Sequence, residues 1–222
     1  MDVAAMISYV LSEVDDPNGA YFTQTQLIRY INQAAQETQK KLIAAGNNWF
    51  LKVPTDGTYV TVANQAKYTP PTDLLQLNRL EIVQNPGVNE NRVALTSITL
   101  NQKDFFYGYS SWPVAFYFQK NDIVLCPAPQ TAGLTIRYYY TYRIAEVTLT
   151  TETVDIPAEF HEYICHQVIL KCFAKDGRDP SFFMALTKQV EERLEKEAIQ
   201  RAQDRASTIV LTSDAFQGYG FY

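Results

Sequence analysis

Hydrophobic positions near the start of the chain have the spacing of two amphipathic helices. Apolar side chains recur every three or four residues in the first 14 residues, until the segment "DDPNG" ends the pattern. Further on, Thr23 and Gln26 have the spacing of a capping box, and Gly46 is a typical stop signal. A helix is therefore predicted over residues 24–45. Its apolar stripe would consist of Leu27, Ile31, Ala34, Ala35, Thr38, Leu42 and Ala45.

From residue 49 to about residue 142 the pattern changes to the alternation of β-strands. Prolines, glycines and asparagines separate short segments that are rich in β-branched and aromatic residues. These segments predict a small antiparallel sheet or a sandwich, with one short helix at its edge over residues 99–109. The expected strands cover residues 58–62, 78–83, 92–98, 116–119, 122–127 and 134–143.

The helical period returns after residue 150. A first helix has an apolar residue at every fourth position, and Pro157 suits its first turn. The segment "DGRDP" interrupts the pattern, and Asp179 followed by Pro180 is typical of a new helix start. The two apolar stripes are formed by Phe160, Ile164, Val168 and Cys172 and by Phe183, Leu186, Val190, Leu194 and Ala198.

These patterns together predict an α+β fold. We expect residues 1–48 and 151–206 to supply the N- and C-terminal helices of one helical core. Residues 49–150 would form a central antiparallel β insertion that loops out from this core. Residues 207–222 show no period, and we expect them to form an extended C-terminal arm.

The amino-acid composition is ordinary for a globular protein and indicates no particular catalytic or binding function. Apolar residues make up 46% and charged residues 19% of the 222 residues, and the net charge is −5, so the whole molecule should not attract nucleic acid or anionic membranes. No apolar run approaches the roughly 20 residues that span a bilayer. The first residues have no basic segment typical of a signal peptide. Three irregularly spaced cysteines form no disulfide framework, so we expect synthesis in a reducing, intracellular environment.

The segment around His161 is the strongest candidate for a metal or nucleophilic site. His161, Cys165 and Cys172 lie on one helix face, but Cys172 would lie about 10 Å along the axis from Cys165, too far to share an ion. Cys126 is the only other soft ligand in the chain. Because the same face carries the apolar stripe, we expect core packing and no metal, cofactor or catalytic site here.

The sequence contains no motif typical of another catalytic or phosphate-binding site. The pattern G-x-S-x-G and a phosphate-binding glycine loop are both absent. The carboxylates of Glu191, Glu192 and Glu195 lie in a charged helical segment and predict a solvated face rather than a catalytic pair.

Aromatic residues crowd the second half of the β segment. A platform that stacks single-stranded nucleic acid or sugars usually has basic neighbours, and only Lys103, Lys120, Arg137 and Arg143 are near. We therefore expect a β core combined with a protein–protein interface. The aromatic residues are Phe105, Phe106, Tyr107, Tyr109, Trp112, Phe116, Tyr117, Phe118, Tyr138, Tyr139, Tyr140 and Tyr142.

The order of several segments resembles the head-to-tail adaptor (connector) proteins of tailed bacteriophages. The segments are "LIRYINQAAQETQKKL", "YTPPTDLLQLNRLEIV", "WPVAFYFQKNDIVLCPAP", "IRYYYTY" and "DIPAEFHEYICHQVIL". In that family a helical core carries a β insertion, and turns similar to "YTPPTDL" and "VLCPAP" recur at these places. Each motif is weakly specific by itself, so the resemblance rests on their order and spacing over nearly the whole chain.

The resemblance implies a structural virion protein without catalytic activity, made in the host cytoplasm and placed in the neck between capsid and tail. Its partners would be the portal protein, tail or nozzle proteins and further copies of itself. The copies would form a twelve-fold ring that continues the DNA channel, through which genome DNA passes without specific binding. Alternatives are another neck or tail-completion ring protein, or a tail-associated peptidoglycan hydrolase that uses glutamates such as Glu159 and Glu162.

The last 16 residues, "STIVLTSDAFQGYGFY", are too apolar for an ordinary disordered tail. Folding back on the chain's own core is one possibility. The favoured interpretation is an arm that docks on the portal or on a neighbouring subunit, which the resembled family also implies. The predicted partner-binding residues are Ile209, Val210, Leu211, Phe216, Tyr219, Phe221 and Tyr222.

Overall fold

A computed structural model describes residues 1–46, 48–87, 89–106 and 112–205 and has the expected α+β class. The chain separates into two compact units. The helical unit contains Met1–Asn48 and the chain from Ile144 onward, and the β unit contains Trp49–Arg143. The sequence analysis ended the β insertion at residue 150. Residues 144–150 group with the helices because Val147 exchanges two hydrogen bonds of 2.9 Å with the Asn32 side chain.

The helical unit contains four α-helices whose ends follow local sequence signals. They are α1 (Val3–Glu13), α2 (Gln24–Ala44), α3 (His161–Asp176) and α4 (Ser181–Arg205), with the short 3₁₀ helix η2 (Ala158–Phe160) leading into α3. Asp2 caps α1 by accepting a hydrogen bond from the Ala5 amide. Gly177 ends α3 in the left-handed conformation that favours glycine.

The predicted capping box at the start of α2 is only half formed. The Thr23 hydroxyl accepts a hydrogen bond from the Gln26 amide at 3.4 Å, as expected of an N-cap. The Gln26 side chain does not return to Thr23. It donates to the Tyr30 hydroxyl at 2.8 Å and accepts from Lys175 on α3 at 2.9 Å. Packing against a neighbouring helix therefore determines where this side chain lies.

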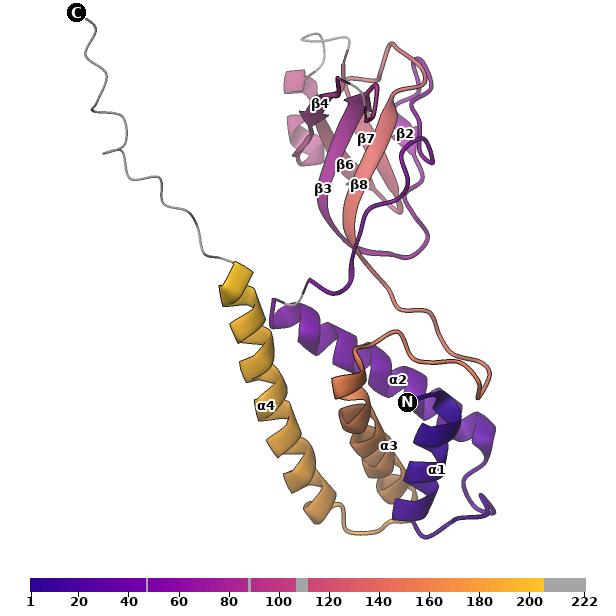
Figure 1. The fold of residues 1–222 in the computed structure, drawn as a ribbon. Coiled ribbons are helices and arrows are strands. Elements are labelled where there is room, and N and C mark those ends of the chain that lie inside the picture. Colours follow the sequence, from indigo (N-terminus) through magenta and orange to yellow (C-terminus); the bar gives the residue numbers. More distant parts are fainter. Residues whose placement is uncertain (47, 88, 107–111, 206–222) are drawn as a thin grey trace, which may run out of the picture. The chain divides into compact units, whose positions relative to one another are not determined.

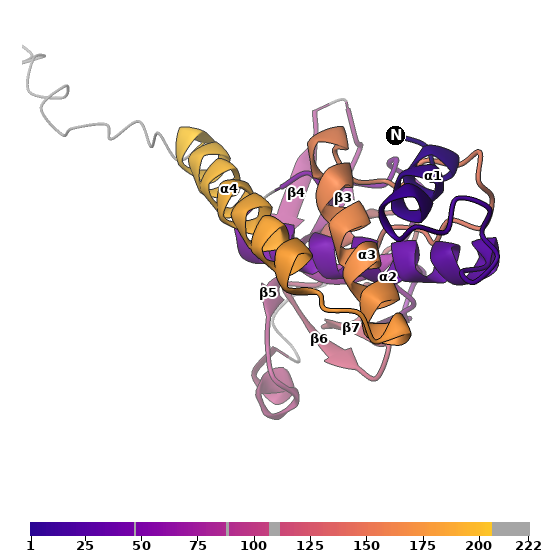
Figure 2. The same ribbon diagram turned by 90° about the horizontal axis from the view of Figure 1, so that it is seen from below.

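Helix α3 lies at the centre of the helical unit. It packs against α1, α2 and α4, and Figures 1 and 2 show α1 on one side of it and α4 on the other. Its buried residues come from all around the helix and not only from the predicted stripe. They are His161, Tyr163, Ile164, Cys165, His166, Val168, Ile169, Cys172 and Phe173.

Two four-stranded sheets make up the β unit (Figure 1). The first has the order β1-β8-β3-β4 and the second β2-β7-β6-β5. The strands are β1 (Leu51–Lys52), β2 (Lys67–Tyr68), β3 (Leu74–Gln84), β4 (Asn91–Ala94), β5 (Thr96–Ser97), β6 (Ala115–Gln119), β7 (Asp122–Cys126) and β8 (Thr135–Tyr142).

Apolar side chains from both sheets share one core, which confirms the sandwich. Leu80 and Tyr138 of the first sheet pack with Phe116 and Leu125 of the second. Along β8, Ile136, Tyr138 and Tyr140 belong to this core, whereas Thr135 and Thr141 on the opposite face are buried as well, so that burial does not alternate strictly.

Two expectations about the strands were wrong in detail. The pairing is not antiparallel throughout, because β5 and β6 run parallel, with Thr96 opposite Ala115. Residues 58–62 are not a regular strand, although Val60 forms a bridge to Thr135 and the backbones of Tyr59 and Thr61 make hydrogen bonds to residues 133–136. The Thr61 hydroxyl accounts for this irregular path, since it donates to the Thr131 carbonyl and accepts from the Leu134 amide.

The short helix expected over residues 99–109 is a 3₁₀ helix, η1 (Leu100–Phe106), within the part of the chain that is described. Phe106 packs on the outer side of the second sheet, against a small cluster formed by Ala115, Tyr117, Val124 and Cys126. The helix therefore covers apolar residues that point away from the main core.

The Tyr138 hydroxyl is buried in the sandwich core with no hydrogen-bond partner among the described residues. We expect Tyr138→Phe to raise the free energy of unfolding by about 1 kcal/mol, because the desolvated hydroxyl is removed. Tyr140→Phe is the matched control. It removes a 2.7 Å hydrogen bond to the Asp73 carboxylate and should lower the free energy by about 2 kcal/mol. Urea unfolding checks both, and a destabilised Tyr138→Phe variant would contradict this account.

Candidate functional site

His161, the centre of the candidate metal or nucleophilic site, is a buried and hydrogen-bonded side chain. Its Nε2 lies 2.8 Å from the Ile156 carbonyl, which can only accept, so this nitrogen carries the proton. Its Nδ1 lies 3.0 Å from the Met1 α-amino group. Burial lowers the pKa of His161, which favours the neutral ring. Both ring nitrogens are thus engaged within the protein.

The cysteines pack as core residues. Cys126, Cys165 and Cys172 are all buried and free. Burial raises the pKa of Cys165 to about 12 and that of Cys172 to about 11, so both thiols stay protonated at neutral pH and are poor nucleophiles. Within the described ranges, no three His, Cys, Asp or Glu side chains gather as metal ligands.

The glutamates considered for hydrolysis lie at the exposed start of α3. Glu162 is exposed, and Arg193 of α4 lies 3.8 Å from its carboxylate. Glu159 is exposed in η2. Both carboxylates are therefore on solvated residues and not in a closed cleft. This surface is better suited to contact than to catalysis.

Helix α4 is attached to α3 mainly through the aromatic ring of Phe183. This ring makes edge-on contacts with Phe173 at 5.3 Å and with His166 at 6.2 Å between centroids. Thr187, one turn further along, is also buried and donates its hydroxyl proton to the Phe183 carbonyl. The neighbouring Phe182 is 69% exposed, and its ring makes an edge contact with Phe183 at 5.3 Å between centroids.

Lys41 of α2 links three helices at one place. Its ammonium group donates to the Tyr163 hydroxyl of α3 at 2.8 Å and forms an ion pair with Glu191 of α4. Burial acts to lower the pKa of Lys41, but the hydrogen bonds to Glu191 and Tyr163 outweigh it and raise the pKa. The lysine therefore stays charged and fixes α4 against the other two helices.

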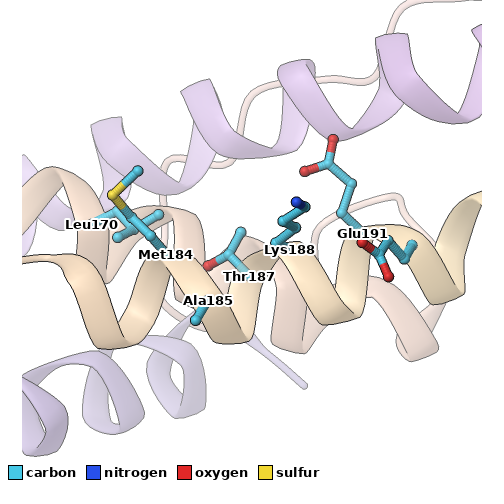
Figure 3. Close-up of a pocket in the computed structure, with 7 residues that line it drawn as sticks. Leu170, Met184, Ala185, Thr187, Lys188 and Glu191 are labelled. Atoms are coloured by element: carbon cyan, nitrogen blue, oxygen red, sulfur yellow. The ribbon is translucent and has the colours of Figure 1, made fainter.

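A groove of about 710 Å³ runs along α4, beside its contact with α3. Figure 3 shows Leu170 of α3 beside Met184 at one end and Glu191 at the other end, with Lys188 near it. Met184 is 57% exposed. The groove thus combines an apolar end with a charged end, an arrangement that suits a peptide or helix from another protein.

Helix α4 is longer than the helix on which it packs. It has 25 residues and α3 has 16. Since Arg193 lies level with Glu162 in the first turn of α3, residues 194–205 extend about 18 Å past that turn. This extension leads toward the C-terminal segment of the chain.

The predicted arm and the observed groove are different parts of the chain. Residues 207–222, with all seven predicted partner-binding residues, lie outside the described residues. Sequence analysis missed Leu170 and Met184, because both lie off the apolar stripes that it used. The available signal was an additional apolar residue on the polar side of each helix.

The described residues therefore form a helical unit with a surface groove and a β sandwich, without a gathered set of metal ligands among them. The sequence matches the family described as SU10 adaptor protein over residues 1–213. The chain belongs to this family of bacteriophage head-to-tail adaptors, which confirms the resemblance and makes the protein a structural component of the virion that interacts with other neck proteins. No curated protein matches the chain. In the described part of the chain, no helix is long and apolar enough to cross a membrane.

Substitution of Phe183 tests how α4 is held. Phe183→Ala removes a buried ring and should lower the free energy of unfolding of the helical unit by about 3 kcal/mol. Phe182→Ala, in the same turn, removes an exposed ring and its edge contact with Phe183, and should lower it by only about 1 kcal/mol. Urea unfolding followed by the helical circular dichroism signal checks both. Equal effects would show that α4 is held in another way.

Proposed function

We propose that this adaptor forms a twelve-fold ring that joins the portal to the tail and continues the DNA channel. The observation that carries the proposal is the family match over residues 1–213, which covers both the helical unit and the β unit. The fold is compatible with such a role, since it offers separate surfaces to several neighbours. The proposed position is the neck between capsid and tail.

In this proposal, α4 is the principal assembly helix. One copy would present the groove beside Leu170 and Met184, and a neighbour would occupy it. The surface that enters the groove would belong to a different part of the neighbouring copy. Because the two surfaces differ, contacts between copies would be heterologous, and heterologous contacts close into rings.

The net charge suits passage of DNA. Each chain carries a net charge of −5, and a ring would carry twelve times that charge. A net-negative channel wall attracts few phosphates and releases few counterions, so DNA slides instead of binding.

We also propose that residues 207–222 dock on the portal or on a neighbouring subunit. Four of the seven apolar candidates are aromatic residues of the kind that anchor an interface. The segment "TIVLT" has the β-branched composition of a strand that can pair with an exposed sheet edge. Binding would order this segment at a cost in conformational entropy, which the anchors must offset.

Truncation after Ala206 tests the arm. The shortened protein should keep its helical circular dichroism signal, because the groove and the helical contacts precede residue 206. It should fail to attach to purified heads that carry the portal, measured by co-sedimentation. Attachment equal to that of the full chain, or loss of the fold, would contradict the proposal.

A pair of full-length variants separates apolar anchoring from chain length. The first replaces Phe216, Tyr219 and Phe221 by Ser and should weaken attachment at least tenfold. The matched control replaces Thr212, Ser213 and Gln217 by Ala and should attach normally. If the control loses attachment equally, the polar part of the segment and not its aromatic residues makes the contact.

A further inference from the structure

A second cleft, of about 480 Å³, lies within the β unit beside the turn between β6 and β7. Pro70 and Pro71 form one part of its wall, and Phe118, Lys120 and Arg143 form another. The prolines are restricted in φ, and the Arg143 amide donates a 2.7 Å hydrogen bond to the Asp73 carbonyl. Both parts of the wall are therefore held by the backbone of the β unit.

The two cations of this cleft have no acidic partner. Lys120 and Arg143 are exposed, and neither makes an ion pair within the described residues. Four other cations of the β unit are paired, for example Arg137, which contacts Asp56 at 2.6 Å and Glu90 at 2.8 Å, while Arg92 and Lys103 also lack an ion pair within the described residues. The described cleft lining contains no carboxylate.

The carboxylates next to the lining residues in the sequence are already engaged elsewhere. Asp73 accepts from Lys52 at 2.6 Å and from the Tyr140 hydroxyl at 2.7 Å. Asp122 binds Lys67 at 2.9 Å and accepts from the Thr69 hydroxyl at 3.1 Å. These contacts leave the positive charge of the cleft uncompensated in a chain whose net charge is −5.

The backbone at Lys120 is unfavourable for a lysine. Lys120 and Asn121 form a two-residue turn between Gln119 and Asp122, and Lys120 has φ of +57°. Asparagine and glycine adopt this left-handed conformation more readily than lysine. A lysine in a strained position that places its charge at a cleft points to a role in binding.

We propose that this cleft binds an acidic peptide segment of another virion protein. Two carboxylates of the segment would pair with Lys120 and Arg143, and an apolar side chain between them would pack on Phe118, which is 49% exposed, and on Pro70. The proline and phenylalanine surface distinguishes this partner from DNA, since a DNA site needs a row of cations to neutralise successive phosphates. Charge complementarity between carboxylate and cation supplies the specificity.

The test is a titration of the isotope-labelled full chain with a capped Glu-Leu-Glu-Leu-Glu peptide, followed by nuclear magnetic resonance. The amide signals of Phe118, Lys120, Asn121 and Arg143 should shift, and a Gln-Leu-Gln-Leu-Gln peptide should bind at least tenfold more weakly. Equal binding of the two peptides, no shift at these amides at millimolar peptide, or tighter binding of a short DNA duplex at the same salt concentration would each overturn the proposal.

Two variants complete the test. Lys120→Glu with Arg143→Glu should weaken binding at least tenfold, whereas the same change of charge at the exposed Lys40 and Lys196 should leave it within twofold. Lys120→Asn should raise the melting temperature, because asparagine fits the turn, and should still weaken peptide binding several-fold. If Lys120→Asn raises the melting temperature and binding is unchanged, Lys120 has no role in recognition and the proposal fails.

Discussion

The helical unit depends on the burial of α3, a helix with apolar residues on nearly every side. A helix of this kind is stable in water only when neighbours surround it. Here the neighbours come from both parts of the chain that flank the β unit, with α1 and α2 before it and α4 after it. The β unit is therefore inserted between two segments that must meet around α3. The same constraint explains why His161, Cys165 and Cys172, which look reactive in the sequence, are core residues.

The surfaces proposed for binding are the ones that stay exposed when α3 and the sandwich core are buried. Helix α4 contributes Phe183 and Thr187 to the contact with α3, and the groove with Met184 and Lys188 runs beside this contact. Its length beyond α3 then extends the helix away from the core. In the β unit, ion pairs engage Lys52, Lys67, Arg79 and Arg137, and the proposed partner would pair with Lys120 and Arg143, which line the cleft.

Local sequence signals predicted the helices and strands better than the contacts between distant segments and the groove that these contacts form. The Thr23 cap, the Gly177 stop and the core-facing residues of β8 were readable, because each depends on neighbouring residues in the chain. The parallel pairing of β5 with β6 was not, since it is determined by contacts between distant segments. Gln26 illustrates the same limit, because Lys175, 149 residues away, binds its side chain. The groove was missed for the related reason that its residues come from two helices and lie off both apolar stripes.

The central claim, that this adaptor assembles as a ring on the portal, is tested most directly by native mass spectrometry of the purified protein mixed with its portal. The account predicts a single complex with twelve copies of this chain per portal ring, formed at the expense of the free protein. A mixture in which the two proteins stay separate, or a complex with another fixed number of copies, would contradict it.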